Sequence, residues 1–99
     1  MFVRLTHFNI PEDQIDSIKT IYYSEIAPVI SQQPGLVNVF LLEPLEVGDD
    51  FISCSIWHNE TDTRAFESSA SYPEVFAKIK AIATKPPMQK YYMAESSSQ

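Results

Sequence analysis

The positions of apolar residues along the chain predict four strands, at residues 2–9, 36–43, 51–57 and 88–94. They are short runs rich in strand-forming residues and are bounded by proline, glycine or polar residues. The third run alternates most regularly, and it places Ser53, Ser55 and Trp57 on one face of a strand. The opposite face of that strand is aliphatic and carries Ile52, Cys54 and Ile56.

The segment between the first two strands predicts an amphipathic helix. Its apolar residues recur at steps of three and four, which gathers them on one side of a helix. Acidic residues directly after Pro11 complement the helix dipole, so the helix should begin there. Pro28 lacks an N–H and crowds the preceding turn, so we expect a bend at that residue. The Gln-Pro-Gly sequence at 33–35 should end the helix.

The segment between the third and fourth strands predicts a second helix that is interrupted in the middle. Asn59 is a suitable N-cap, and Asp62 follows it by three residues. Apolar residues then recur at helical spacing. The serine-rich residues 68–73 should divide this helix into two, and the proline pair at 86–87 should stop it.

The order of these elements is β-α-β-β-α-β, which predicts an α+β fold of the ferredoxin-like type. A four-stranded antiparallel sheet would carry two helices on one face. The length predicts a single domain over residues 1–99, with a polar tail at 95–99.

The alternation within the strands also predicts which side chains meet the helices. We expect the aliphatic sets of the second strand (Val37, Val39 and Leu41) and of the third strand to do so. The other face of the sheet would then carry Leu36, Asn38, Phe40 and Leu42 from the second strand and Ser53, Ser55 and Trp57 from the third. Because that face is too apolar to lie in water, we expect a homodimer through the open sheet face.

Composition and charge exclude several kinds of partner. The chain has 7 Lys+Arg against 13 Asp+Glu, a net charge of −6, so nucleic acids and anionic membranes would be repelled. Two glycines cannot form a glycine-rich nucleotide loop. We expect no membrane span and no signal peptide, and the single cysteine, Cys54, favours the reducing cytoplasm.

Three stretches of the sequence form a pattern that we recognise. They are Pro28 with Gln33-Pro34-Gly35-Leu36-Val37, then Ser55-Ile56-Trp57-His58-Asn59-Glu60, then Phe66, Ser69 and Tyr72. With the order of elements, they resemble the antibiotic biosynthesis monooxygenase-like group of dimeric α/β-barrel proteins over residues 2–94. The resemblance implies a dimer of two facing sheets, with pockets between the open sheet face and the helices. Some members oxidise electron-rich aromatic molecules with dioxygen and no cofactor, whereas relatives degrade haem, isomerise lactones or only bind ligands.

The chain departs from this group at two places. Many members have a histidine in the helix after the strand-ending tryptophan, at a position where this chain has Phe66. That difference argues against general acid–base chemistry at the position where those members carry the histidine. The haem-degrading relatives require an asparagine, a tryptophan and a histidine at positions corresponding to Leu5, Phe66 and Lys80, so haem degradation is not expected.

An oxygenase of this kind needs an apolar pocket, a proton acceptor and a group that stabilises an anion. The catalytic candidates are Asn38, Trp57, His58 and Tyr72, and the substrate-binding candidates are His7, Phe40, Ser53, Ser55 and Phe66. Arg4 could hold an anionic substrate group, whereas Arg64 suits a surface ion pair. Two histidines without metal-binding spacing and one distant cysteine predict no metal site.

These candidates also have purely structural interpretations. Trp57 could fill the core of a dimer, and Tyr72 could cap the core of the monomer. His58 could be an exposed turn residue, and His7 a partly buried residue bonded to the backbone. Cys54 suits a small buried hydrophobic position better than a nucleophile.

Two functions therefore follow from the sequence. The first is a cofactor-independent monooxygenase that acts on a small aromatic or quinol-type substrate with dioxygen. The second is a non-catalytic dimeric protein that binds a small hydrophobic ligand or has a structural role. The family resemblance favours the first, and the missing histidine at Phe66 favours the second.

Overall fold

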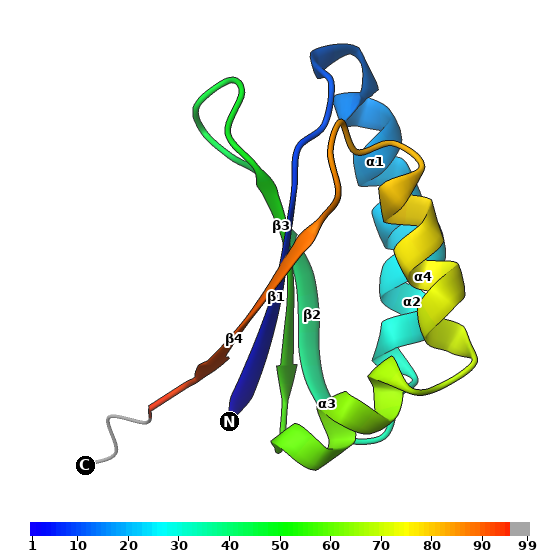
Figure 1. The fold of residues 1–99 in the computed structure, drawn as a ribbon, viewed down its shortest axis with the longest axis vertical. Helices are drawn as coiled ribbons and strands as arrows, with labels where there is room; N and C mark the ends of the chain where they lie inside the picture. The colour runs from blue at the N-terminus through cyan, green and yellow to red at the C-terminus, as the bar shows by residue number, and fades with distance from the viewer. Residues whose placement is uncertain (96–99) are drawn as a thin grey trace.

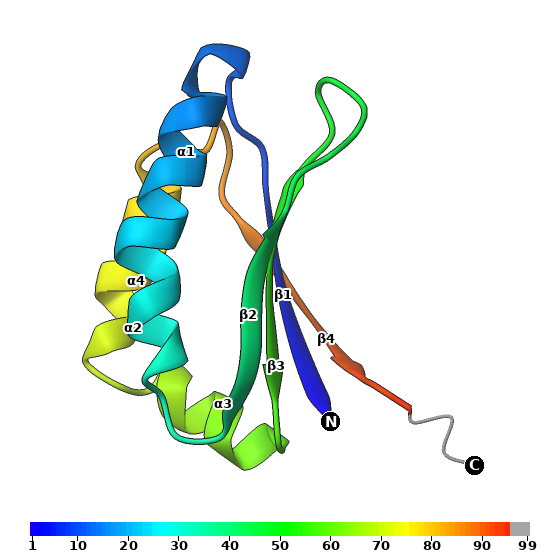
Figure 2. The ribbon, with the colours of Figure 1, turned by 180° about the vertical axis from the view of Figure 1, so that it is seen from behind.

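In the computed structural model, residues 1–95 are described and form a four-stranded antiparallel sheet with all helices on one face (Figures 1 and 2). The strands are β1 (Phe2–Phe8), β2 (Leu36–Leu42), β3 (Phe51–Trp57) and β4 (Met88–Met93). Their order in the sheet is β2-β3-β1-β4. The predicted ferredoxin-like fold is confirmed, and the predicted tail lies outside the described residues beyond Glu95.

The first helical segment is continuous but changes its geometry along its length. It consists of η1 (Glu12–Gln14), α1 (Ile15–Ile21), η2 (Tyr22–Ile26) and α2 (Ala27–Ser31). The η2 turns are π-helical and end at Ile26, two residues before Pro28. Because proline cannot donate to the preceding turn, a widened turn beside it lets the helix continue. The structure thus has a π-helical insertion ahead of Pro28, and the bend at Pro28 itself stays a prediction.

The second helical segment is divided in two, as predicted. Its parts are α3 (Glu60–Glu67) and α4 (Ser71–Lys80). The backbone N–H of Asp62 donates to Asn59 Oδ1 over 2.8 Å, which confirms Asn59 as the N-cap of α3. The helix α4 ends at Lys80, several residues before the proline pair.

The prediction for the two faces of β3 is wrong. Ser53, Ser55 and Trp57 are buried on the side of the helices, and the aliphatic set with Cys54 lies on the open side of the sheet. The two serines are satisfied there, because the Tyr22 hydroxyl lies 2.7 Å from Ser53 Oγ and Trp57 Nε1 donates to Ser55 Oγ over 2.8 Å. Trp57 buries more apolar surface than any aliphatic residue of the strand.

The strand β2 follows the prediction only from Val39 onward. Val39 and Leu41 pack against the core as expected. A bulge between Leu36 and Asn38 brings Leu36 to the core as well, and Val37 is left 41% exposed. Asn38 pairs with Ile56, and Phe40 pairs with Cys54. These two residues therefore lie on the opposite face from the buried serines, which corrects the predicted grouping.

The open face of the sheet is predominantly apolar. From the register and alternation of the strands, it carries Val3, Leu5, His7, Asn38, Phe40, Leu42, Ile52, Cys54, Ile56, Met88, Lys90 and Tyr92. No helix within residues 1–95 is long and apolar enough to cross a membrane. The helix side of the sheet is the buried core, where any polar group requires a partner.

Candidate functional site

A buried cation lies between the sheet and the helices. Alternation along β1 turns Arg4 toward the helix side, where it is only 6% exposed. Its Nε donates to Glu67 Oε2 over 2.7 Å, and one Nη donates to Thr6 Oγ1 over 2.9 Å. The other Nη donates to the Tyr72 hydroxyl over 2.7 Å. We refer to Arg4, Glu67, Tyr72 and Tyr91 as the Arg4 cluster.

Glu67 is the acceptor at the centre of this cluster. Its carboxylate accepts from Arg4, from Arg64 and from the hydroxyl of Tyr91. Burial by itself would raise the pKa of Glu67, but the hydrogen bonds from these three residues outweigh it and lower that pKa. Burial and the bond to Glu67 raise the pKa of the Tyr91 phenol. At neutral pH the cluster therefore contains a carboxylate and a neutral phenol.

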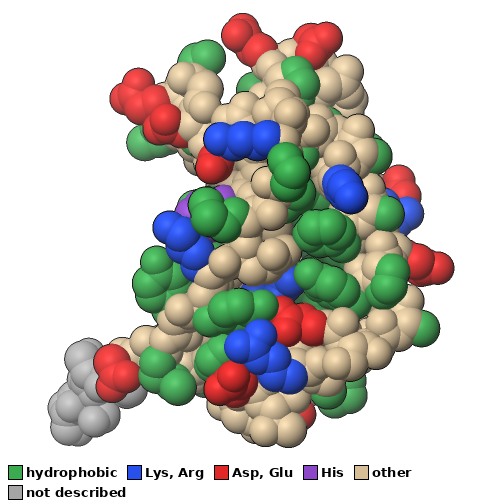
Figure 3. All heavy atoms as spheres, in the orientation of Figure 1, with side chains coloured by type: hydrophobic (Ala, Val, Ile, Leu, Met, Phe, Trp, Pro, Cys, Tyr) green, Lys and Arg blue, Asp and Glu red, His purple; other side chains and the backbone are tan. Residues whose placement is uncertain are grey.

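A row of aromatic rings runs beside Arg4 from β3 to α4. Trp57 stacks on Phe66 with ring centroids 5.5 Å apart, and Phe66 meets Tyr72 edge-on at 5.4 Å. Tyr72 in turn stacks on Phe76, and the Arg4 guanidinium lies 5.1 Å from the Tyr72 ring centroid. Figure 3 shows basic and acidic side chains next to one another near α3, bordered by hydrophobic ones. The arrangement combines a positive charge, a phenol and flat apolar walls.

The Arg4 cluster is approachable from the β4 edge of the sheet and closed behind. Trp57 is fully buried, and Phe66 is nearly so. Tyr72 and Gln89 are half-buried, and Tyr91 is 37% exposed. Gln89 Nε2 donates to the Tyr72 hydroxyl over 3.4 Å, so side chains of β4 border this hydroxyl.

Five of the nine predicted site residues lie together between the sheet and the helices. They are Ser53, Ser55, Trp57, Phe66 and Tyr72. Trp57 and the serines belong to the core of one chain, so the prediction that they line the open face does not hold. Tyr72 reaches Arg4, which the sequence had offered as a holder of an anionic group.

The other four predicted residues do not join them. Asn38, Phe40 and His7 lie on the open face, and His58 is exposed just after β3. The Nε2 atom of His7 is buried and has no hydrogen-bond partner within residues 1–95. Asn38 Oδ1 accepts from the N–H of Val39.

Sequence reasoning missed Thr6, Glu67 and Tyr91. The alternation of β1 was a usable signal, since it places Arg4 and Thr6 on the face that also carries Phe8. An arginine in that pattern needs a buried anion. The sequence did not reveal that Glu67 supplies it, because the pairing depends on how α3 packs against β1.

None of the described hollows has a residue of the Arg4 cluster in its walls. The largest, of about 420 Å³, is at the far end of the sheet beside the β2–β3 loop. One of about 230 Å³ lies against α3 and includes Phe66 among its walls. None of the described hollows is lined by Asn38, Trp57 and Tyr72 together. Within residues 1–95, no three histidine, cysteine or carboxylate side chains come close enough to hold a metal ion.

The sequence profile of one protein family, described as antibiotic biosynthesis monooxygenase, matches residues 1–78. No curated protein matches the chain. Solved structures, in contrast, match the chain in their fold. A monooxygenase from the gene ActVA-Orf6 of Streptomyces coelicolor, in complex with the ligand nanaomycin D, superposes with a TM-score of 0.82 at 14% identity, covering 99% of this chain and 90% of its own.

Two further solved structures have the same fold. SnoaB, a cofactor-independent oxygenase from Streptomyces nogalater, gives a TM-score of 0.75 at 14% identity, over 97% of this chain and 94% of its own. A conserved protein from Methanosarcina mazei gives 0.78 at 14% identity, over 96% and 94%. At these identities the structures establish the fold, and the profile establishes the family.

Proposed function

The chain belongs to the antibiotic biosynthesis monooxygenase family, and on that premise we propose that it oxygenates a small quinol-type aromatic molecule with dioxygen. The observation that carries the proposal is the Arg4 cluster, in which a buried guanidinium and the phenol of Tyr72 adjoin stacked aromatic rings. In the reaction, a phenol and the ring C–H opposite it become two carbonyl groups. One oxygen atom of dioxygen enters the product, and the other leaves as water with both hydrogens.

Arg4 is the group that we propose to activate the substrate. A phenol bound beside a guanidinium loses its proton more readily, because the positive charge favours the phenolate. The phenolate is electron-rich enough to reduce dioxygen itself, so the substrate supplies the electrons that a cofactor would otherwise provide. Arg4 and the Tyr72 hydroxyl would bind the phenolate oxygen, and this stabilisation of developing charge is the protein's main contribution. The phenolic proton would leave to solvent at the half-open β4 edge, and one proton would be taken up again when the second oxygen atom leaves as water.

The remaining side chains would shape this site. Trp57 and Phe66 form the closed apolar wall behind Tyr72. Glu67 holds the guanidinium of Arg4 in a fixed orientation through a 2.7 Å contact. Ser53 and Ser55 anchor the ring of Tyr22 and the indole of Trp57, so they would act through packing rather than by touching substrate.

Four sequence candidates have no part in the proposed site. Asn38, Phe40 and His7 lie on the other side of the sheet, and His58 is exposed. Neither histidine is therefore within the layer that holds Arg4. This is why we propose activation by positive charge rather than by a histidine base.

The direct test is oxygen uptake with a panel of phenols, naphthols and polyphenols that keep a C–H opposite a hydroxyl group. Incorporation of one labelled atom from ¹⁸O₂ into the product would establish oxygenation. Arg4→Gln and Tyr72→Phe should each reduce turnover of a substrate by at least about tenfold, in the range found for charge-stabilising groups. Tyr23→Phe is the matched control, because the Tyr23 ring is exposed and its hydroxyl accepts from the N–H of Leu41 on β2, and it makes no contact with Arg4. Full activity of folded Arg4→Gln would refute the proposed role of Arg4.

A second candidate function is ligand binding without turnover. The observation that favours it is the closed packing of Trp57 and Phe66, together with the absence of Arg4 from the walls of the described hollows. Binding of an aromatic molecule without oxygen uptake or label incorporation would support this function over oxygenation.

We also propose that the open face of the sheet is covered by a second copy of the chain. Its apolar strands leave aliphatic and aromatic side chains without partners, and a twofold dimer would pair them with their own copies. Sedimentation should show a dimer, and Leu5→Asp on this face should yield monomers. Ser17→Asp on the exposed side of α1 is the control and should leave the dimer intact. A monomeric unmodified chain would overturn the proposal.

The location that we propose is the cytoplasm. Cys54 is a free and buried thiol, and burial raises its pKa, so it is kept as a thiol rather than a thiolate. An unpaired thiol is typical of reducing compartments. Cell fractionation tests this location.

A further inference from the structure

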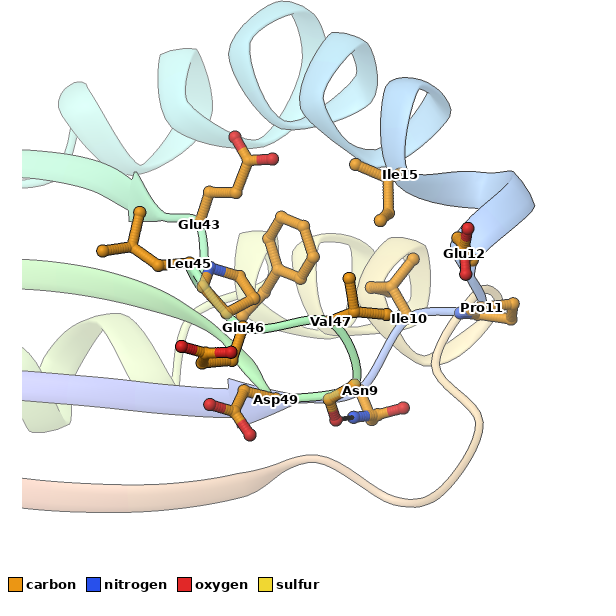
Figure 4. Close-up of a pocket in the computed structure, with 13 residues that line it drawn as sticks. Asn9, Ile10, Pro11, Glu12, Ile15, Glu43, Leu45, Glu46, Val47 and Asp49 are labelled. Carbon is orange, nitrogen blue, oxygen red and sulfur yellow. Dashed lines mark hydrogen bonds between the residues drawn. The ribbon is translucent and has the colours of Figure 1, made fainter.

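At the opposite end of β1 from the Arg4 cluster lies a hollow of about 420 Å³ that the proposed oxygenation does not use (Figure 4). Its walls come from two segments that are distant in the sequence. One is the chain from Asn9 to Ile15, which links β1 to the first helix, and the other runs from Glu43 to Phe51 across the β2–β3 loop. Its volume lies within the range of small-molecule pockets, about 300–1,000 Å³. We call this hollow the end pocket.

The interior of the end pocket is apolar. Ile10 and Phe51 are buried at its base, and Ile15 is half-buried above them. Figure 4 shows Ile15 pointing from the helix side toward Ile10 and Val47. In the loop, Val47 is 86% exposed and Leu45 is fully exposed, so this wall has apolar surface that no part of the described chain covers. An apolar molecule in the hollow would remove that surface from water.

The charged residues that line the end pocket are all acidic. They are Glu12, Glu43, Glu46 and Asp49. Glu43 is paired with Lys19 across 2.9 Å, whereas the other three have no ion-pair partner within residues 1–95. In Figure 4 the side chains of Glu12 and Glu46 lie at the margins of the hollow rather than at its base. The mouth of the pocket is therefore negative, and its interior is apolar.

The loop that forms the outer wall is held in place by Asn9, the residue that follows β1. Asn9 Nδ2 donates to the carbonyl of Gly48 over 2.8 Å and to Asp50 Oδ1 over 3.1 Å. The N–H of Asp49 donates to the carbonyl of Glu46 over 3.2 Å and closes the turn. Gly48 has a φ of +94°, a conformation that glycine adopts without strain. A wall fixed in this way is preorganised, which lowers the entropy cost of binding.

We propose that the end pocket binds a small organic cation with an apolar body, such as a protonated alkylamine or arylamine. The apolar body would lie against Ile10, Ile15 and Phe51, and the ammonium group would lie at the negative mouth, which has Glu12 on one side and Glu46 on the other. This occupant follows from charge complementarity. An anion of the same shape would be repelled by the carboxylates, and a neutral molecule would gain only the apolar contact.

Three probes with the same alkyl chain test the proposal: n-octylammonium, 1-octanol and octanoate. The unmodified protein is titrated with each at low ionic strength, and the amide signals are followed by ¹⁵N–¹H NMR. We expect octylammonium to bind most tightly, with shifts concentrated at Ile10, Val47 and Phe51, and octanoate to bind at least about tenfold more weakly. Equal binding of octanoate would overturn the proposal. Shifts by octylammonium at other sites, or no shifts up to its solubility limit, would also overturn it.

Variants separate the charge from the apolar contact. Glu12→Gln and Glu46→Gln should each weaken octylammonium binding about two- to fivefold, the range for exposed ion pairs, and should leave octanol binding unchanged. Glu25→Gln is the control, because Glu25 is an exposed carboxylate on η2 paired with Lys78. Val47→Ser changes an exposed residue and should weaken octylammonium and octanol alike. Unchanged octylammonium affinity in the Glu12→Gln/Glu46→Gln double variant would refute the role of charge, whatever the oxygen-uptake assay shows.

Discussion

The turn before β2 allows a sharp test of how α3 is positioned. Gly35 has a φ of +83°, and a Cβ atom added there would lie 2.6 Å from the Cβ of Asp62 and closer still to its carboxylate. Gly48 has a similar φ of +94°, but an added Cβ would meet no atom within 4 Å. Gly35→Ala and Gly48→Ala therefore share the conformational cost, and only Gly35→Ala adds a collision.

The expected magnitudes follow from these two contributions. A left-handed conformation costs an alanine about 1–2 kcal/mol, which is the whole expected effect of Gly48→Ala. The collision at Gly35 involves the Cβ of Asp62, which is fixed to the backbone, so rotating a side chain cannot relieve it. Overpacking of this kind adds about 1–3 kcal/mol. Gly35→Ala should then cost about 2–5 kcal/mol, and each kcal/mol corresponds to about 4–8 °C in Tm for a domain of this size.

The assay is urea unfolding at one fixed protein concentration, followed by tryptophan fluorescence. A double-mutant cycle with Asp62→Gly isolates the collision, because this change removes the Cβ that Gly35→Ala would meet. Asp62→Gly should be less destabilising in the Gly35→Ala background than in the unmodified chain, by about 1–3 kcal/mol.

Either of two results would refute this reasoning. One is a cost of Gly35→Ala no larger than that of Gly48→Ala, and the other is a coupling of zero in the cycle. The outcome also bears on the candidate site, because α3 carries Glu67 and Phe66. A shift of α3 to relieve the collision would displace the carboxylate that orients Arg4, so Gly35→Ala should lower turnover in the proposed oxygenation together with stability.

Three further predictions concern the core. Arg4→Gln should destabilise the fold by about 2–4 kcal/mol in urea unfolding, because it leaves a partly buried carboxylate short of a partner, whereas Arg64→Gln at an exposed pair should have a much smaller effect. The pKa of Glu67 is lowered from 4.5, so its stabilising contribution is present above pH 4.5 and is lost as the pH falls through the lowered value. In Glu67→Gln, the free energy of unfolding should therefore fall less steeply as the pH is lowered below 4.5. An unchanged pH dependence below 4.5 would contradict this assignment. Trp57 is fully buried on the helix side, so acrylamide should quench its fluorescence weakly and equally in the unmodified chain and in a monomeric variant; stronger quenching in the monomer would place Trp57 on the open face.

The sequence determined the elements of this protein and their order. Helical periodicity, the cap at Asn59, the interruption at 68–73 and the strand at 51–57 all depend on residues that are close in the chain. Local backbone preferences and local hydrogen bonds act over a few residues, so they can be read without the fold. The family resemblance also rested on short local motifs, and the profile match confirmed it.

The sequence could not determine which face of β3 meets the helices. Alternation separates the residues of a strand into two sets, but both sets of β3 are compatible with burial: one carries Trp57, and the other is aliphatic. The serines beside Trp57 suggested exposure, whereas their burial depends on the Tyr22 hydroxyl from the first helical segment and on the indole of Trp57. A partner supplied from a distant part of the chain cannot be found by examining one strand.

Only the tertiary structure decided the make-up of the candidate site. Arg4 could be singled out as a charged residue in an apolar strand, but its meeting with Glu67 and Tyr72 joins residues more than 60 positions apart. The end pocket likewise forms where the loop after β2 is fastened to Asn9. Local sequence specifies which elements form, and long-range packing specifies which side chains meet, because burying a charge or a polar group is favourable only when the partner that compensates it is in place.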